Sequence, residues 1–475
     1  MPRLLISAAH KSSGKTTVSM GLCAALTQRG LAVQPFKKGP DYIDPMWLSA
    51  ASGRECRNLD PYLMGTAEMT ALFTRHAAGA DLSLVEGNKG LYDGLALDGS
   101  NSNAALAQLL GLPVLLVIDA RGMTRGIAPL ILGYQAFDRN IRIAGVILNN
   151  LGGSRHETKL RQMIEHYTDV PVVGAIQRDD RLALQERHLG LIPSAELDDA
   201  ARRIAQIGER VGAQVDLDRL IAIAGSAAAL VSAPARVARI RPVAARKIRI
   251  GLARDRAFGF YYPDDLDELR AAGAEIVPFD TLRDQCLPDV DGLFIGGDFP
   301  ELFMDELEAN LGLRTQIRTA IEAGLPVYAE CGGLMYLART LSWKGKTRNM
   351  VGAIPGDAVM HDRPVGRGYV QLAETGRSPW PIAEGEASGN LRGHEFHHSS
   401  LENLDQDITY AYKVKRGHGV DGENDGIVVN NVLASYSHLR SLDAANWASR
   451  FAAFVRQSGW TNASVPSASP ARAIA

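Results

Sequence analysis

The sequence has little cysteine and no long apolar run, and its positive and negative charges are nearly equal in number. Only 4 of its 475 residues are cysteines, namely Cys23, Cys56, Cys286 and Cys331, and none of them form a CxxC pair or a metal-ligand spacing. This scatter excludes a disulfide-rich secreted scaffold. It favours free thiols in a reducing compartment, so we expect the chain in the cytoplasm.

The balance of charge excludes two further classes of partner. Lysine and arginine number 51 and acidic residues 53, which gives a formal net charge of −2 and no basic field for nucleic acid or an anionic membrane.

No apolar run approaches the ~18–20 residues of a transmembrane helix. The amino terminus is apolar for only a few residues, which indicates a buried first strand rather than a secretory signal. The sequence leaves the oligomeric state open, a homodimer included.

Short runs rich in Val, Ile and Leu alternate with helical patterns, which is typical of parallel strands joined by crossover helices. The length requires more than one domain. We expect an α/β fold with a parallel-sheet nucleotide-binding domain over residues 1–195 and a helical connection over 196–246. A second α/β domain should follow over 247–458, and a disordered tail rich in Ser, Ala and Pro over 459–475.

The segment SGKTT follows the first predicted strand and opens a helix. Backbone N–H groups at Gly14 and Thr17 suit phosphate oxygens, Lys15 supplies a positive charge, and the Thr16 hydroxyl suits Mg²⁺. The leading glycine of a standard phosphate-binding loop is absent, so an ordinary polar turn is the alternative. The strand before and the helix after favour ATP binding.

Acidic and basic residues follow two more of the predicted strands. Lys37 and Lys38 precede the turn that contains Asp41 and Asp44, and Glu86 ends a later strand. The carboxyl ends of parallel strands meet at one edge of a sheet, so these side chains should lie near the phosphate-binding loop. Asp41 and Glu86 are our candidate Mg²⁺ ligands with Thr16, and Lys37 is a candidate phosphate contact. Taken alone, the Asp41–Asp44 turn is more often structural.

Two further polar residues are expected at the same edge. Lys89 follows Glu86 by three residues and suits an anionic substrate, although a solvated surface charge is the alternative. Asn149 ends a later strand and could reach an adenine edge, which as a lone Asn in a turn is a weak indication.

The second domain contains a pattern for a cysteine nucleophile. Cys331 stands between a buried strand and a glycine-opened helix, the setting of a nucleophile elbow, where the helix N-terminus should lower the pKa of the thiol. Gly296, Gly297 and Gly332 could supply backbone donors to an oxyanion or to a glutamine substrate. His438 follows a late strand and is the candidate base. A lone buried cysteine is usually inert, but the flanking glycines favour catalysis here.

Together these motifs resemble the cobyrinic acid a,c-diamide synthase family, which fuses a dethiobiotin-synthetase-like ATPase domain to a flavodoxin-like class I glutamine amidotransferase domain. The resemblance covers nearly the whole chain and rests on a set of motifs: SGKTT, QPFKKGPDYIDP, VEGNKGLYDG, GGDFPEL, YAECGGLMYL, RGHEFHHS and ASYSHL. It implies a glutaminase nucleophile at Cys331 activated by His438. It ties a further group of residues to ATP, Mg²⁺ or a tetrapyrrole: Asp41, Tyr42, Ile43, Glu86 and Asp93. We add Asp44 and Lys89 to Tyr42, Ile43 and Asp93 as candidate contacts to the acceptor.

The resemblance also implies that the third, acidic member of other amidotransferase triads is missing, and the sequence offers no strong candidate for it. Four positions depart from the pattern of many corrinoid members: Asn88 and Lys89 replace Val-Met, Asp298 replaces a third glycine, and Arg440 replaces a second histidine. Lys89 and Arg440 would both suit a polycarboxylate acceptor.

These patterns predict a ligase that amidates tetrapyrrole acetate groups with ATP, Mg²⁺ and L-glutamine, with cobyrinate or hydrogenobyrinate as the acceptor. The departures keep sirohaem or nickel-sirohydrochlorin as alternative acceptors. A nucleotide-switched regulatory ATPase is a distant alternative, because it would explain only the first domain and leave Cys331 and His438 without a role.

Overall fold

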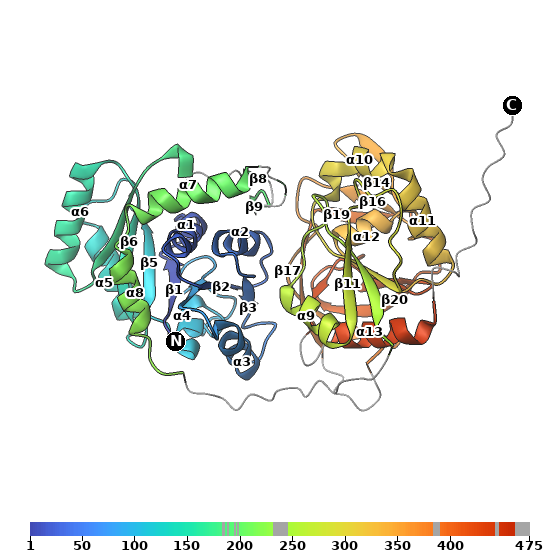
Figure 1. The fold of residues 1–475 in the computed structure, drawn as a ribbon, viewed down its shortest axis with the longest axis horizontal. Helices are drawn as coiled ribbons and strands as arrows, with labels where there is room; N and C mark the ends of the chain where they lie inside the picture. The colour runs from blue at the N-terminus through green and yellow to red at the C-terminus, as the bar shows by residue number, and fades with distance from the viewer. Residues whose placement is uncertain are drawn as a thin grey trace. The chain divides into compact units, whose positions relative to one another are not determined.

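The computed structural model describes residues 1–182, 186–187, 190–193, 196, 199–230, 246–382, 390–441 and 446–460. The chain divides into two compact units, Met1–Val237 and Ala238–Ala475, which Figure 1 shows in blue to green and in yellow to red. Of the expected tail, 459–475, only the first two positions belong to the described residues, and positions 461–475 lie outside them.

The first unit is built on a sheet of seven parallel strands. In chain order they are β1 (Arg3–Ala8), β2 (Val33–Lys38), β3 (Arg57–Leu59), β4 (Leu82–Glu86), β5 (Val114–Asp119), β6 (Ile143–Leu151) and β7 (Val172–Gln177). Their order across the sheet is β3-β2-β4-β1-β5-β6-β7. Nearly every strand residue is buried, because helices cover both faces of the sheet, and this explains why the strands appear in the sequence as continuous apolar runs. The expected parallel α/β sheet is confirmed.

Eight α-helices accompany this sheet in the described part of the unit. They are α1 (Lys15–Gln28), α2 (Ile43–Ser52), α3 (Thr66–Ala77), α4 (Asn103–Leu110), α5 (Ile127–Phe137), α6 (Ser154–Tyr167), α7 (Ala200–Gly212) and α8 (Leu217–Gly225). Helices α1, α2 and α7 pack together on one face, and α3 and α4 pack on the other (Figure 1). A short 3₁₀ turn, η1 (Asp180–Leu182), and the small strand pair β8 (Glu186–Arg187) and β9 (Gly190–Leu191) follow β7.

The segment expected to be a connection contributes to the core of the first unit. Ile204, Ile207 and Val211 form a buried stripe along α7 at the spacing of an amphipathic helix, and they pack in one cluster with Val18 and Leu22 of α1. Residues 231–245, the rest of the expected connection, lie outside the described residues.

The second unit contains a mixed sheet of ten strands. They are β10 (Ile248–Ala253), β11 (Ala274–Phe279), β12 (Gly292–Ile295), β13 (Val327–Glu330), β17 (Gly366–Glu374), β18 (Leu391–His397), β20 (Thr409–Arg416), β21 (Asn424–Val429), β22 (Val432–Ser435) and β23 (His438–Leu439). The order is β11-β10-β12-β13-β22-β21-β20-β17-β18-β23. The first five strands in this order are parallel, as the sequence predicts, and the others are antiparallel.

The remaining elements of this unit surround the mixed sheet. A four-stranded sheet comprises β14 (Thr340–Trp343), β15 (Lys346–Asn349), β16 (Asp357–Met360) and β19 (Ser399–Glu402). The helices are α9 (Pro263–Ala271), the 3₁₀ helix η3 (Pro300–Phe303), α10 (Met304–Ala309), α11 (Leu311–Glu322), α12 (Gly332–Leu337) and α13 (Trp447–Ser458).

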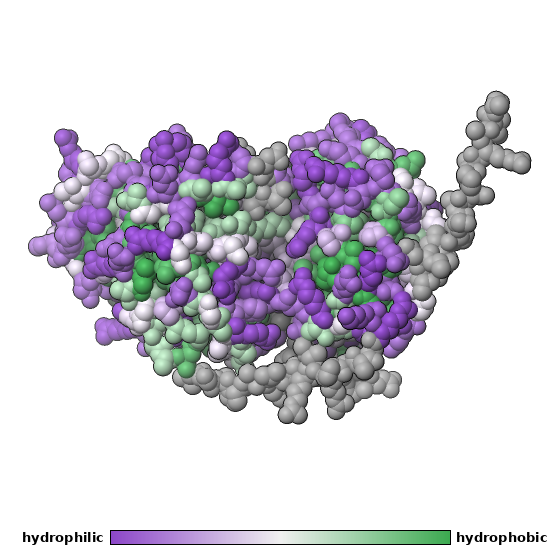
Figure 2. All heavy atoms as spheres, viewed as in Figure 1, coloured by the Kyte–Doolittle hydropathy of each residue, from purple (hydrophilic) through white to green (hydrophobic). Residues whose placement is uncertain are grey.

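Figure 2 shows a mainly hydrophilic face with smaller apolar patches between polar side chains. Among the described residues, none of the helices combines the length and the apolar character that a bilayer-crossing helix needs.

Candidate active site

The phosphate-binding loop connects β1 to α1. Gly14 caps α1 with φ = 86°, and a side chain there would also clash with Asn149. Asn149 lies in β6, and its Nδ2 donates to the Ser13 carbonyl oxygen (2.9 Å). The amide group that we expected to meet adenine therefore holds the loop in place.

Lys15 lies at the start of α1 and is almost fully buried. Its Nζ donates to the carbonyl oxygen of Lys89 (2.6 Å), which joins the phosphate-binding loop to the loop after β4. Burial lowers the pKa of Lys15 to about 8, although the nearby Glu86 opposes that shift. A triphosphate bound here would favour the charged form.

Two carboxylates, a lysine and a hydroxyl meet beside this loop. The Thr16 hydroxyl donates to Glu86 Oε1 (2.9 Å) and to Asp44 Oδ2 (3.1 Å). Lys37 Nζ lies 2.5 Å from Asp44 Oδ2 and 3.0 Å from Glu86 Oε1. Burial alone would lower the pKa of Lys37, but Asp44 and Glu86 hold it well above its ordinary value, so Lys37 balances their charge.

Asp41 lies next to this cluster rather than within it. Its Oδ1 accepts the Asp44 N–H (3.1 Å), and its Oδ2 is 3.7 Å from Lys37 Nζ. Burial and then the neighbouring Asp44 raise the pKa of Asp41 to about 7. Tyr42 is the N-cap residue of α2 and Ile43 its first residue. The structure thus brings Asp44, which we expected at the acceptor, against Thr16 and places Asp41 behind it.

The donor set of this cluster fits a divalent cation. Glu86 is fully buried, and its Oε2 has no hydrogen-bond partner among the residues that the structure describes. Burial raises the pKa of Glu86, and Lys37 opposes that shift. Carboxylate and hydroxyl oxygens are the ligands that Mg²⁺ prefers. Thr16, Asp44 and Glu86 are therefore the residues that could hold it.

The loop after β4 has a defined shape because Asn103 holds it. Nδ2 of this fully buried side chain donates to the carbonyl oxygens of Asn88 (2.5 Å) and Gly90 (2.8 Å), and its Oδ1 accepts the Asn88 N–H (3.1 Å). Asp93 accepts the Gly90 N–H (2.8 Å) and so closes the loop. Lys89 is left exposed between these anchors with φ = 45°. The sequence indicated Lys89 and Asp93 but gave no reason to single out Asn103.

In the second unit, Cys331 occupies the predicted sharp turn between β13 and α12. Its backbone has φ = 49° and ψ = −102°, and its N–H donates to the Ser435 carbonyl oxygen (2.7 Å). A positive φ at a residue with a side chain is strained, and such strain is concentrated at functional sites. The turn geometry of a nucleophile elbow is confirmed.

His438 contacts Cys331 from strand β23. Its Nδ1 lies 3.2 Å from Glu330 Oε2, and the His394 ring stacks on its face with centroids 4.9 Å apart. Burial alone would lower the pKa of His438, but hydrogen bonds to Cys331 and Glu330 raise it to about 10. The imidazole is therefore prepared to hold a proton beside the thiol.

The structure corrects the view that no acidic residue accompanies this pair. Glu330 directly precedes the cysteine in the sequence and is only 2% exposed. Its position before Cys331 was the available signal, but a strand-end carboxylate does not by itself indicate which histidine it meets.

The glycine-rich loop after β12 requires a second correction. The Gly296 N–H donates to the buried Tyr261 hydroxyl (3.0 Å), so Gly296 is not a free oxyanion donor. Gly297 lies close to both His438 and Cys331, because a Cβ there would be 2.7 Å from His438 Cε1 and 3.6 Å from Cys331 Cβ. Gly332 packs on Asp298, with a Cβ position 3.0 Å from its carbonyl oxygen. Gly297 and Gly332 remain the candidate glutamine-binding glycines.

Arg440 does not face an acceptor site as the sequence suggested. The side chain is 1% exposed and donates to Asp264 Oδ2 (2.7 Å), and its guanidinium lies over the Tyr262 ring at 4.8 Å. The ion pair with Asp264 and the contact with Tyr262 hold the Arg440 side chain within the second unit.

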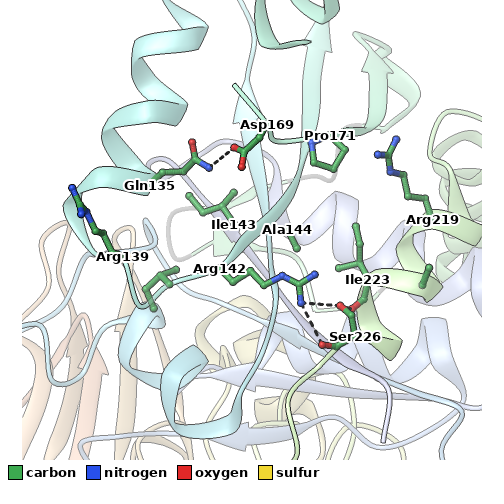
Figure 3. A pocket seen from close by; sticks show the side chains of 12 residues that line it. Gln135, Arg139, Arg142, Ile143, Ala144, Asp169, Pro171, Arg219, Ile223 and Ser226 are labelled. Atoms are coloured by element: carbon green, nitrogen blue, oxygen red, sulfur yellow. Dashed lines mark hydrogen bonds between the residues drawn. The ribbon is translucent and has the colours of Figure 1, made fainter. Parts of the chain in front are cut away.

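Two cavities of the first unit differ in their relation to the site. One of about 190 Å³ adjoins the phosphate-binding loop and is lined by Ser12, Gly14, Thr17, Asn149 and Asn150, among others. A larger groove of about 680 Å³ lies at the amino ends of β6 and β7, where Gln135 bonds to Asp169 and Arg142 to Ser226 (Figure 3). Ligands of parallel sheets bind at the carboxyl ends, so the smaller cavity is the one that suits a nucleotide.

Comparison with known proteins agrees with both halves of the site. Residues 5–192 match the CobQ/CobB/MinD/ParA nucleotide binding domain, and residues 249–446 match the CobB/CobQ-like glutamine amidotransferase domain. The cobyrinate a,c-diamide synthase of Magnetococcus marinus is 48% identical over 97% of this chain and 98% of its own length. That of Methanosarcina acetivorans is 45% identical over 93% of each chain. The chain belongs to the cobyrinate a,c-diamide synthase family.

Membership confirms the resemblance inferred from the motifs and the order of the two domains. It also confirms, for the family, the class of glutamine-dependent carbon–nitrogen ligases. A solved glutamine amidotransferase covers 43% of this chain at 16% identity with a TM-score of 0.32, a likeness too weak to carry an argument.

The close approach at Gly297 leads to a first prediction. Gly297→Ala should lower kcat for glutamine hydrolysis about 100-fold, because the added methyl would displace the His438 ring from Cys331. Gly312→Ala, at an exposed position of α11 in the same unit, is the control, because Gly312 also lacks a positive φ and an added methyl there would approach only the Gln285 carbonyl oxygen, at 3.3 Å. Steady-state glutaminase assays and thermal unfolding measure both effects. Near-normal hydrolysis by a folded Gly297→Ala variant would contradict the placement of these three residues.

Proposed function

We propose that this protein amidates the a- and c-acetate carboxylates of a tetrapyrrole, cobyrinate or hydrogenobyrinate, using ATP and glutamine. The observation that supports this most strongly is the pairing of two chemistries in one chain. A phosphate-binding loop beside Thr16, Asp44 and Glu86 lies in one unit, and a Cys331–His438 pair lies in the other. The matched relatives carry the name cobyrinate a,c-diamide synthase.

The first unit would activate the acceptor. A carboxylate oxygen of the acceptor attacks the γ-phosphorus of ATP, and the bond from that phosphorus to the β,γ-bridging oxygen breaks. The products of this step are ADP and an acyl phosphate. Lys15 and Lys37 stabilise the charge that spreads over the phosphate oxygens. Mg²⁺ held by Thr16, Asp44 and Glu86 would neutralise the phosphates, and Gly14 and Thr17 would complete the phosphate contacts.

The second unit would supply ammonia. Cys331 Sγ forms a bond to the carboxamide carbon of glutamine, and its proton passes to His438 and then to the departing nitrogen. Water hydrolyses the resulting thioester to glutamate and restores the thiol. Ammonia attacks the carbonyl carbon of the acyl phosphate, the bond to phosphate breaks, and the nitrogen loses one proton to give the amide and inorganic phosphate. Gly297 and Gly332 would donate to the substrate oxygen as it becomes an oxyanion, a role supported by the closeness of Gly297 to Cys331 and His438. We place this reaction in the cytoplasm, where the cysteines remain free thiols.

The acceptor would bind near Lys89, Asp93, Tyr42 and Ile43, at the edge of the sheet where Glu86 lies. Lys89 is the exposed cation of this group, and its loop is fixed by the bond from Lys15 to its carbonyl oxygen. A lost ion pair with an acceptor carboxylate would cost about 1–3 kcal/mol, or about 5- to 150-fold in binding.

We therefore predict that Lys89→Met raises KM for the acceptor by that factor and leaves KM for ATP nearly unchanged. The substitution keeps the backbone carbonyl that Lys15 uses. Lys89→Arg, which keeps the charge, should retain most of the affinity. Initial-rate kinetics with each substrate varied in turn measure the effect. Equal rises in both KM values would show that Lys89 shapes the loop and does not bind the acceptor.

A panel of tetrapyrrole acids tests the proposed acceptor. We expect ATP turnover to rise when cobyrinate or hydrogenobyrinate is added with glutamine. Turnover of sirohaem or nickel-sirohydrochlorin at about tenfold higher kcat/KM, worth about 1.4 kcal/mol, would overturn the corrinoid acceptor and leave the amidation chemistry standing. No stimulation by any tetrapyrrole would instead favour a regulatory ATPase.

A further inference from the structure

A buried carboxylate contacts the catalytic imidazole on the side away from the cysteine. Glu330 Oε2 lies 3.2 Å from His438 Nδ1. Its other oxygen, Oε1, accepts the Tyr328 hydroxyl (2.7 Å) and the Leu439 N–H (3.0 Å). With both oxygens engaged and 2% exposure, the carboxylate has one fixed orientation.

The sheet explains how neighbours of the cysteine reach the histidine. Strand β13 pairs in parallel with β22, and the register places Glu330 opposite Ser435. The chain then leads within three residues to His438 in β23, which pairs with His394 of β18. Because Glu330 and Cys331 are consecutive, the same strand end supplies a partner to each side of the imidazole.

This contact determines what the imidazole can do. A carboxylate at Nδ1 fixes the proton there, so the neutral ring presents Nε2 as the acceptor for the thiol proton. It also stabilises the imidazolium that forms, in keeping with the pKa of about 10 for His438. Burial raises the pKa of Tyr328, which therefore remains a hydrogen-bond donor to Glu330.

Other polar groups near the ring do not take this role. His394 stacks on the ring face, and burial, His438 and Arg440 lower its pKa well below the ordinary value, so it is neutral. Arg440 pairs with Asp264. Among the described residues, the charged and titratable groups that face His438 or its partners include Cys331, Glu330, His394, Arg440, Asp264 and Asp265, and the tyrosines Tyr261, Tyr262, Tyr328, Tyr412 and Tyr436.

We propose that Glu330 is the positioning residue that completes a Cys331–His438–Glu330 triad, supplied by the residue directly before the nucleophile. The inference rests on the proposed glutaminase role of Cys331 and His438. It replaces the expected two-residue site with a three-residue one.

The test uses the full chain with Cys286→Ser, which removes the exposed thiol. Of the three cysteines that remain, Cys23 and Cys56 are fully buried, whereas Cys331 is 8% exposed. In Glu330→Gln, the amide nitrogen would face Nδ1 as a donor and favour the wrong tautomer. We expect kcat for glutamine hydrolysis to fall about 100-fold with KM nearly unchanged. Ammonium-dependent amidation should be unaffected.

A pH profile separates positioning from a structural effect. Glu330 raises the pKa of His438, so its loss should move the alkaline limb of the pH profile of glutamine hydrolysis, where His438 loses its proton, to lower pH. Glu395→Gln is the matched control. Glu395 is equally buried in the same unit, 3.7 Å from His397, and accepts the His418 and Gly419 N–H groups.

We expect Glu395→Gln to change thermal unfolding without moving the alkaline limb of the pH profile of glutamine hydrolysis. The triad would be overturned if Glu330→Gln left both kcat and the alkaline limb unchanged. It would also be overturned if Glu395→Gln moved the alkaline limb by the same amount as Glu330→Gln. Glutamine hydrolysis that survives Cys331→Ala would instead overturn the proposed function itself, so the two failures are distinguishable.

Discussion

We expect Cys331→Ala to abolish glutamine-dependent amidation and to leave ammonium-dependent amidation intact. The thiol is the only group in the described site that can form the thioester, and removing such a nucleophile lowers the rate by about 1,000-fold or more. In the proposed mechanism, acyl activation depends on Lys15, Lys37 and Glu86 in the other unit, which the substitution does not touch. Product formation is followed by mass spectrometry with glutamine or with an ammonium salt at alkaline pH.

The control is Cys286→Ala, which removes an exposed cysteine of the same unit and should change neither reaction. Equal losses with both nitrogen donors in the Cys331→Ala variant would contradict a division of labour between the two units.

Glu86→Ala should have the opposite pattern. It removes a fully buried carboxylate that contacts both Thr16 and Lys37, so amidation should fall about 100-fold or more with either nitrogen source. Basal glutamine hydrolysis should persist, because the Cys331 site lies in a separate compact unit. Glu86→Gln keeps the side-chain volume and should show the same loss if charge is the cause.

Glu55→Ala serves as the control, because Glu55 is a half-exposed carboxylate of the same unit that pairs with Arg57. Thermal unfolding distinguishes lost activity from lost structure. Near-normal amidation by a folded Glu86 variant would remove this residue from the phosphate or metal site.

Much of the fold could be predicted from the sequence because strands buried on both faces form continuous apolar runs. The apolar runs that the sequence shows at 82–86, 114–119 and 248–253 form β4, β5 and β10. The antiparallel half of the second sheet was not predicted. Strand β20, for example, buries only Ala411 and Tyr412 and carries Lys413, Lys415 and Arg416, so it lacks that signal.

The sequence motifs predicted which residues belong to the candidate sites, but not which side chains contact one another. Both Asp41 and Asp44 could be placed near the phosphate-binding loop, but the order of contacts depends on the first turn of α2. There the Asp44 side chain points to Thr16, and Asp41 accepts the Asp44 N–H. Likewise, the contact of Glu330 with His438 spans 108 positions in the chain and depends on strand pairing that no local pattern encodes.

The most direct test of the central claim follows nitrogen and phosphate together. Glutamine labelled with ¹⁵N in its amide is incubated with ATP and with cobyrinate whose carboxylates carry ¹⁸O, and product and phosphate are analysed by mass spectrometry. We predict ¹⁵N in each new amide, one ADP per amide, and ¹⁸O transferred from the carboxylate to inorganic phosphate, as an acyl phosphate requires. Amide formation without ¹⁸O in the phosphate, or ATP turnover without ¹⁵N in any tetrapyrrole acid, would contradict it.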